Sequence, residues 1–369
     1  MKSKNLGNRN WIFTISHLMV GMIFFFSCQK QVQQESLSPE TVLEEETADG
    51  IFPYLRLSTY GFFEGDIKNL KPVADLIFYQ PASSLFTDNA FKSRFVYIPE
   101  GEKAQLEGDD LSLPLGSVLV KNFFYPADFR NPQGDRRIIE TRLMIREENG
   151  WQAYPYVWNE SQSDAVLKVI GGEFEISYVD LQGKQQLVSY LVPNKNQCKG
   201  CHNKNEIMAP IGFQTKHLNH SLDFVQSPSN QLEFLTETGK LEGFKGASKH
   251  PGMVNYEDES QALAQRAMAY LDINCAHCHS AEGPASTSGL FLTYDQKDPM
   301  KLGINKTPVA AGSGAGGFKF DIVPGKPDES ILVHRMNSTQ AGIAMPELGR
   351  TTVDKKGLEL IKAWISNME

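Results

Sequence analysis

The sequence predicts an α+β multidomain protein, in which an N-terminal antiparallel β sandwich or barrel-like domain is followed by a mainly α-helical region. Two observations predict this fold class. From about residue 51 to 195, short runs of valine, isoleucine and aromatic residues are separated by turn signals, which is typical of antiparallel strands. After residue 259, apolar residues recur at helical spacing instead. Strands followed along the chain by helices indicate segregated β and α layers.

Turn signals set the strand pairings in the first region. RRIIETRLMIREENGWQAYPYVWN contains two strand-like runs joined through Asn149 and Gly150, a strong hairpin signal. GEFEISYVD and QQLVSYLVP are expected to pair across a turn at residues 181–184. Both pairings are antiparallel.

Two later segments, ESQALAQRAMAYLDIN and DKKGLELIKAWISNM, carry helical stripes. Asp354 is the expected N-cap of the second helix. The apolar faces consist of Leu263, Ala267, Tyr270 and Leu271 in the first segment, and of Leu358, Ile361, Trp364 and Ile365 in the second. Each helix is expected to bury that face.

Four of the five cysteines form two copies of one pattern, C-x-x-C-H. They are QCKGCH, with Cys198, Cys201 and His202, and NCAHCH, with Cys275, Cys278 and His279. This pattern is a c-type haem attachment site. Two cysteines three apart can bond the two vinyl groups of a porphyrin, and the adjacent histidine then becomes the proximal iron ligand. The sequence therefore predicts two covalent haem c groups, and a mainly α-helical cytochrome c-type haem region.

The alternatives for each CxxC pair are a zinc site and a thiol/disulfide redox pair. A redox pair needs no following histidine, yet both pairs have one. Zinc ribbons usually separate their CxxC pairs by about 15–20 residues, whereas the chain from Cys201 to Cys275 is far longer. Haem is therefore favoured at both motifs. His277, at a variable position of the second motif, is expected to lie on the surface and not to be a ligand.

A sixth iron ligand is expected for the second haem from Met345, which precedes Pro346 in a loop before the last helix. Met336 and His334 lie in ESILVHRM, a predicted short helix, where methionine usually packs. The distal ligand of the first haem stays open between several alternatives. They are Met208, His217, His220, a ligand from the β domain, or a five-coordinate iron.

Residues 1–27 are predicted to be a signal peptide of lipoprotein type. A basic segment precedes the apolar WIFTISHLMVGMIFFFS, which ends directly before Cys28. Cys28 is the expected lipidation site, and an uncleaved membrane anchor is the alternative. Residues 28–50 have the polar, acidic composition of a flexible tether. Both alternatives place the rest of the chain outside the cytoplasm.

The motifs also predict how the rest of the chain divides into domains. A β-rich domain is expected at residues 51–195, a first haem-binding segment at 196–258, and a class I cytochrome c-like domain at 259–369. The formal net charge of −8 and the lack of basic blocks argue against a nucleic-acid partner.

With these residues placed, the sequence resembles a family of exported bacterial dihaem c-type cytochromes. The resemblance lies in the stretches SSLFTDNAFKSRFVYIP, ETRLMIREENGWQAYPYVWNESQSDA, NQCKGCH, NQLEFLTETG, YLDINCAHCHSAEGPASTSGL, VPGKPDESILVHRM and MPELG. It covers nearly everything after residue 51. The resemblance implies electron transfer through the two haems, with redox partner proteins whose identity the sequence does not give. Some members of the family are associated with sugar dehydrogenase domains.

The expected function is a membrane-tethered dihaem cytochrome that transfers electrons in the bacterial cell envelope, as partner of a periplasmic dehydrogenase. One alternative is a haem enzyme, either peroxidase-like or an oxidoreductase subunit. Another is a glycan-binding β module with a haem domain. Tyr154, Tyr156 and Trp158 alternate onto one strand face, where they form either a stacking platform or sheet core; core is favoured because aromatics are ordinary strand residues.

Overall fold

The computed structural model describes residues 52–223 and 228–369. The predicted signal peptide, Cys28 and the tether lie outside these residues. The described residues belong to one compact unit. Within the described part of that unit, no helix has the length and apolar character needed to cross a membrane.

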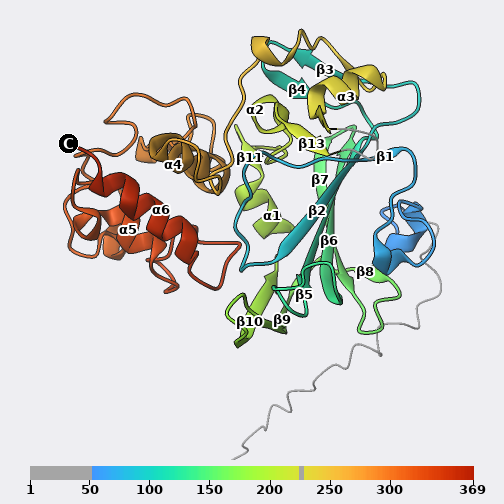
Figure 1. The fold of residues 1–369 in the computed structure, drawn as a ribbon, viewed down its shortest axis with the longest axis horizontal. Helices are drawn as coiled ribbons and strands as arrows, with labels where there is room; N and C mark the ends of the chain where they lie inside the picture. The colour runs from blue at the N-terminus through green and yellow to red at the C-terminus, as the bar shows by residue number, and fades with distance from the viewer. Residues whose placement is uncertain (1–51, 224–227) are drawn as a thin grey trace, which may run out of the picture. The chain divides into compact units, whose positions relative to one another are not determined.

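A six-stranded antiparallel sheet forms the centre of the β region, with the strand order β1-β2-β5-β6-β7-β8 (Figure 1). Its strands are β1 (Leu76–Phe78), β2 (Phe91–Tyr97), β5 (Val118–Pro126), β6 (Arg136–Glu147), β7 (Gly150–Trp158) and β8 (Ala165–Leu167). The predicted hairpin is confirmed: Glu147 pairs with Gly150, whose φ of 109° suits glycine. The sheet is open, since β1 and β8 are its edges.

One face of this sheet buries an aromatic-rich core. Tyr154, Tyr156 and Trp158 are 8%, 0% and 6% exposed and belong to it. The indole Nε1 of Trp158 donates a hydrogen bond to Thr141 Oγ1 at 2.9 Å. The interpretation of this strand face as core is confirmed, so these three rings offer no exposed stacking platform.

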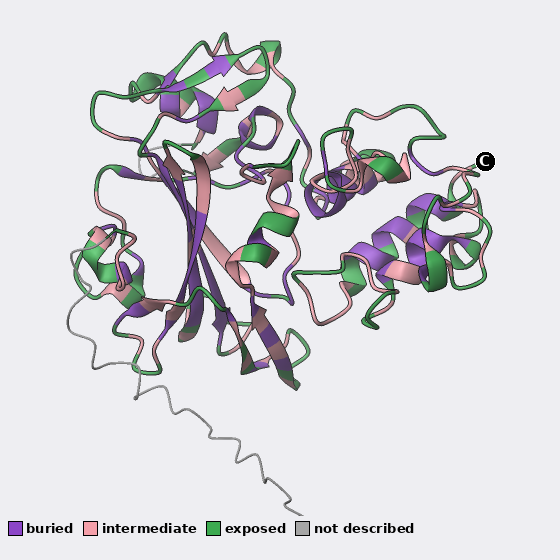
Figure 2. Cartoon of the chain, turned by 180° about the vertical axis from the view of Figure 1, so that it is seen from behind, coloured by how far each residue is buried: buried purple, intermediate pink, exposed green. Residues whose placement is uncertain are grey.

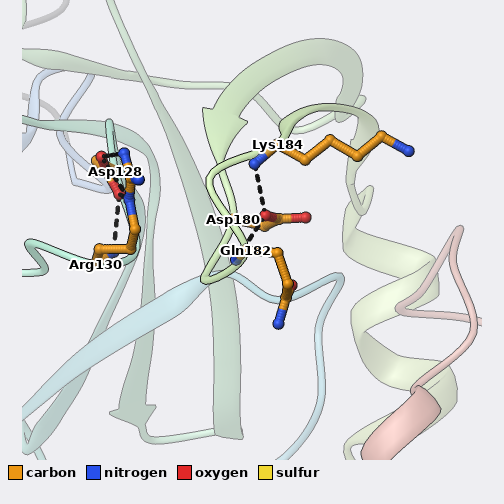
Figure 3. A network of polar contacts seen from close by, with 5 residues as sticks. All are labelled: Asp128, Arg130, Asp180, Gln182 and Lys184. Atoms are coloured by element: carbon orange, nitrogen blue, oxygen red, sulfur yellow. Dashed lines mark hydrogen bonds and ion pairs between the residues drawn. The ribbon is translucent and has the colours of Figure 1, made fainter.

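The hairpin of β9 (Gly172–Val179) and β10 (Gln185–Val192) packs its apolar residues against the opposite face. Asp180 accepts hydrogen bonds from the backbone N–H groups of Gln182 and Lys184, both at 2.9 Å (Figure 3). These bonds close the predicted turn at residues 181–184, which is confirmed. Arg130, paired with Asp128, lies beside the same turn (Figure 3).

Shorter elements complete the fold. The further strands are β3 (Ala104–Glu107), β4 (Asp110–Ser112) and β15 (Leu241–Glu242) in one sheet, with the pairs β11 (Asn203–Lys204) and β12 (Ile207–Met208), and β13 (Ser221–Asp223) and β14 (Pro228–Asn230). The α-helices are α1 (Lys195–Cys201), α2 (Thr215–Leu218), α3 (Gln231–Glu237), α4 (Leu263–Leu271), α5 (Ile331–Met336) and α6 (Lys355–Ser366).

Both predicted helical stripes are confirmed in α4 and α6, whose inner faces are buried (Figure 2). Asp354 caps α6 by accepting a hydrogen bond from the backbone N–H of Gly357 at 2.9 Å. The two helices cross closely at Gly357, because a Cβ built there would lie 2.2 Å from the Tyr270 ring. Only glycine fits at this crossing.

The predicted fold class is wrong. The structure is mostly β-sheet with few helices, 22% helical and 27% strand, and a mainly α-helical cytochrome c-type haem region is not evident. An open sheet with a packed hairpin replaces the expected β sandwich or barrel. Between α4 and α5 the chain is rich in glycine and proline, which interrupt helices, and it forms turns instead. Two correctly predicted helices therefore did not imply a helical region.

One contact joins distant parts of the chain. The carboxylate of Asp88 accepts hydrogen bonds from the backbone N–H groups of Thr351 and Thr352, both at 2.8 Å, and from Thr352 Oγ1 at 2.7 Å. Asp88 is 2% exposed. The loop before β2 is thereby fastened to the segment that leads into α6.

Candidate haem attachment sites

The first motif lies on a short helix, α1, whose N-terminus is closed by two reciprocal hydrogen bonds. Asn194 Oδ1 accepts from the backbone N–H of Gln197, and Gln197 Oε1 accepts from the N–H of Asn194, both at 2.9 Å. This capping box fixes the start of the helix directly after β10. Cys198 and Cys201 then lie one turn apart, on the same side of α1.

His202 ends α1 and is held in one tautomer. Its Nδ1 lies 2.9 Å from the carbonyl oxygen of Ala209, to which it donates a hydrogen bond. Nε2 is then the nitrogen with the free lone pair. Burial lowers the pKa of His202 to about 3, so the ring is neutral near pH 7. A neutral imidazole with its other nitrogen bonded to a backbone carbonyl is the arrangement of a proximal metal ligand.

A cavity opens beside the first motif, and we call it the first cavity. One wall is a face of the central sheet, and the other walls come from the loop before β2, from α1 with the chain on either side of it, and from the C-terminal region. It is lined by both cysteines, His202, the sheet residues Leu119, Lys121, Arg142, Met144 and Ala153, and residues from the C-terminal region that include Tyr270, His277 and Arg350. The first motif thus faces both the sheet and the C-terminal region.

Three cations lie directly opposite one another on adjacent strands of this wall. Arg94 of β2 pairs in register with Lys121 of β5, which pairs with Arg142 of β6. We call these three residues the cation row. Like charges directly opposite each other destabilise a sheet. The repulsion within the cation row must therefore be offset by negatively charged groups outside the row.

Only part of that compensation comes from the described protein groups. Glu140 forms the ion pair with Arg142; burial alone would lower the pKa of Arg142, but Glu140 outweighs it and raises the pKa. Burial lowers the pKa of Lys121 well below its ordinary value, and Arg94 acts in the same direction. Because Lys121 and Arg142 line the first cavity, an anionic group there would offset the repulsion.

The second motif follows α4 through one turn of π-helix, Asp272–Ala276. Nδ1 of His279 lies 3.4 Å from Ser288 Oγ, and burial lowers the pKa of His279 to about 4. Burial raises the pKa of Cys275 and of Cys278 to about 12. Burial also raises the pKa of Cys198 and of Cys201.

A second cavity lies between the motif and α5. It is lined by Cys275, His279, Leu290, Leu292, Lys306, Leu332, Arg335, Met336 and Met345, among others. The predicted ligand Met345 and its rival Met336 therefore both reach the cavity that contains His279. His334 does not line it and packs against the ring of Phe318.

The three distal ligands expected for the first haem do not reach the first cavity. Met208 belongs to the packed core under the sheet. His217 Nε2 lies 3.1 Å from Asp272 Oδ1, and His220 Nε2 lies 2.8 Å from the Gln80 carbonyl oxygen. Each side chain thus has a structural partner, although Nδ1 of His217 is buried without one.

His277 is half-buried, whereas the sequence predicts a surface residue. It lines the first cavity together with His202, and its Nδ1 is buried without a hydrogen-bond partner. Burial lowers the pKa of His277 to about 4, so the ring is neutral. The signal that could have found it is its residue type, since a histidine at a variable position of CxxCH can ligate a metal as readily as it can face solvent.

The two motifs lie close together. Cys201 contributes to the raised pKa of Cys278, after burial itself, which requires the two thiols to be near each other. Even so, residues 52–223 and 228–369 hold no group of three or more His, Cys, Asp or Glu side chains able to bind a metal ion. A zinc site would need four such ligands. A haem needs only one or two from the protein, because the porphyrin supplies the rest.

The residues present fit haem c at each motif: two thiols, a neutral imidazole with one nitrogen free, and an apolar cavity beside them. Comparison of the chain with known family models, curated proteins and solved structures finds no match. The assignment therefore depends on the residues themselves.

Proposed function

We propose that this protein is a dihaem c-type cytochrome that transfers electrons in the bacterial cell envelope. One observation carries the proposal: each C-x-x-C-H motif holds a neutral histidine with Nδ1 turned to a protein acceptor, beside protonated thiols in a lined cavity. This supports covalent haem at Cys198 and Cys201, with a second at Cys275 and Cys278.

Each residue has a role in holding the group. The cysteine sulfurs would bond the porphyrin, and His202 and His279 would be its iron ligands on one side. Met345 would ligate the second iron on the other side. Lys121 and Arg142 line the first cavity and would pair with haem carboxylates there. When bound, haem would supply one-electron redox chemistry, and the apolar walls would exclude water.

Electron transfer is favoured over substrate chemistry because each cavity is lined by a second potential ligand besides the histidine of the motif. A peroxidase needs an open iron face with an acid or base beside it. The second cavity offers thioethers from Met336 and Met345 instead. The glycan-binding alternative loses its main support because its three aromatic rings are buried.

Export with lipidation at Cys28 remains part of the proposal. Cys28 follows the apolar segment, and the polar residues after it suit a tether to the membrane. Labelling with a radioactive fatty acid should modify the wild type and leave Cys28→Ser unlabelled. A redox partner such as a periplasmic dehydrogenase is expected to be the electron donor.

A pyridine haemochrome assay tests the central proposal. The protein would be produced with a haem-attachment system, as wild type, Cys198→Ala/Cys201→Ala and Cys275→Ala/Cys278→Ala. We expect two covalent haems in the wild type and one in each double variant. A wild type with no haem and with bound zinc by metal analysis contradicts the proposal, and a wild type with one haem limits it to the motif whose variant loses that haem.

A further inference from the structure

The first motif needs a partner on the distal side of its iron, and the structure supplies a candidate from the other motif. We propose that His277 is the distal ligand of the iron held at the first motif. The inference depends on the proposed function, since it concerns the ligation of that haem. It makes the first haem bis-histidine, with one ligand from each C-x-x-C-H sequence.

Position is the first argument. His277 and His202 line the same cavity, although 75 residues separate them in the chain. They are also close enough for His277 to contribute to the lowered pKa of His202, after burial and other groups. A haem in that cavity has both imidazoles at its walls.

The unused ring nitrogen is the second argument. Nδ1 of His277 is buried and makes no hydrogen bond of standard geometry, although the backbone of Ile273 lies close enough to the ring to act on its pKa. A buried polar atom left unpaired costs about 1–3 kcal/mol. A metal ion that accepts the lone pair of an imidazole nitrogen would remove this cost.

Competing groups in the first cavity are already engaged. Nζ of Lys121 lies 4.8 Å from the centroid of the Phe123 ring and belongs to the cation row. Met144 is 7% exposed and packs in the core under the sheet. Met336 and Met345 also line the second cavity, where His279 needs a distal partner.

Ligation by His277 has a consequence for electron transfer. Cys275 and Cys278 hold the second haem, and His277 lies between them in the sequence. The same short loop would therefore bind one porphyrin through sulfur and the other iron through nitrogen. This arrangement brings the two haems together without any further protein element.

The test is the spin state of the ferric protein, measured by electron paramagnetic resonance and optical absorption on the full chain with both haems. We expect wild type to be fully low-spin. His277→Leu should convert one of the two haems to high-spin, and added imidazole should restore it. His334→Leu is the matched control, because His334 also has a buried ring nitrogen, Nε2, without a partner, and lines neither cavity.

His277→Met provides a second variant that keeps a ligand at the position. It should remain low-spin but raise the reduction potential of the first haem, because a thioether in place of imidazole raises haem potentials. Unchanged spectra and potentials in His277→Leu and His277→Met overturn the inference. So does a high-spin haem in Lys121→Leu or Met144→Leu instead.

Haem counting separates this inference from the proposed function. If pyridine haemochrome shows two covalent haems in all variants and the spin state does not respond to His277, only the ligand assignment fails. If the wild type carries no haem at the first motif, the proposed function fails there, and the ligand assignment fails with it.

Discussion

The two C-x-x-C-H motifs share one sequence pattern but lie in different surroundings. The first is on α1, next to the central sheet, and faces a wall that carries the cation row. The second follows α4 through a π-helical turn and faces α5 and the loop around Met345. In both, the histidine of the motif is neutral, because burial lowers its pKa. The pattern therefore determines the local arrangement of two thiols and an imidazole, while the charged groups and methionines around them come from remote parts of the chain.

The largest effect is expected from a substitution at the crossing of α4 and α6, which lies near the second motif alone. Gly357→Ala places a Cβ against the Tyr270 ring, where a built atom would lie 2.2 Å away. Overpacking of this kind costs up to about 3 kcal/mol. We expect urea unfolding to show that loss.

Gly200→Ala is the matched control, because its Cβ would meet Leu348 at an ordinary 3.6 Å within α1. It should be neutral or stabilise α1 by up to about 1 kcal/mol, the helix-propensity difference. Equal effects of the two substitutions would contradict the close crossing at Gly357.

Met345→Leu tests the distal side of the second site. We expect it to produce one high-spin haem and to lower that haem's reduction potential by more than about 100 mV, since axial ligands set haem potentials over roughly 0.8 V. Met336→Leu should leave both properties unchanged, because Met336 packs in α5. Redox titration followed by optical spectra measures both. If the effects are reversed, Met336 is the ligand.

Lys121→Met tests whether the cation row acts on the first site and not on the second. Removal of a cation beside the first cavity disfavours the more negative, reduced haem. We expect the potential of the first haem to fall by about 60 mV, a tenfold change in a one-electron equilibrium, and the second to stay the same. Lys184→Met, on the exposed β9–β10 turn, is the control (Figure 3). A fall in both variants would point to net charge instead of the cation row.

The smallest expected effect concerns the contact that joins α2 to the π-helical turn. Burial lowers the pKa of His217, so the unfolded state binds its proton first and stability should fall as pH drops below about 6.5. Burial acts to raise the pKa of Asp272, but His217 and Lys216 outweigh it and hold that pKa at about 2. The Asp272 contribution is therefore present above about pH 4 and is lost only at lower pH.

Urea unfolding of wild type and His217→Gln between pH 7 and 5 measures this effect. The wild type should lose about 1 kcal/mol over that range, because one pKa unit corresponds to about 1.4 kcal/mol. The variant should lose less. Parallel pH profiles would show that His217 does not contribute.

Local patterns predicted local structure well, and contacts between distant segments were out of reach. Asn149 with Gly150 identified the β6–β7 hairpin, and Asp354 identified the start of α6. The cation row could not be predicted, because Arg94 and Lys121 meet only through a register that the intervening strands determine. The predicted fold class was wrong for a related reason. Helical patterns identify individual helices, but they do not show that the chain between two helices forms turns.

The same reasoning explains the site. Spacing identified the cysteines and histidines of the two motifs, because each motif spans only five residues. Spacing could not place His277 in the first cavity, because the walls of that cavity come from distant segments that include α1, the strands β5, β6 and β7, and the chain from α4 onward. Distance along the chain was the basis for proposing Met208, His217 and His220 as distal ligands of the first haem. That distance does not show where a side chain points.

The bond between Asp88 and the Thr351–Thr352 segment has a consequence for the order in which the protein matures. Its partners are 263 and 264 residues apart. A ribosome releases Asp88 long before its partners, so the loop that holds it stays incomplete until nearly the whole chain has been synthesised. Contacts of such long sequence separation slow folding. We therefore expect both C-x-x-C-H sequences to remain accessible as unfolded chain until synthesis is almost complete.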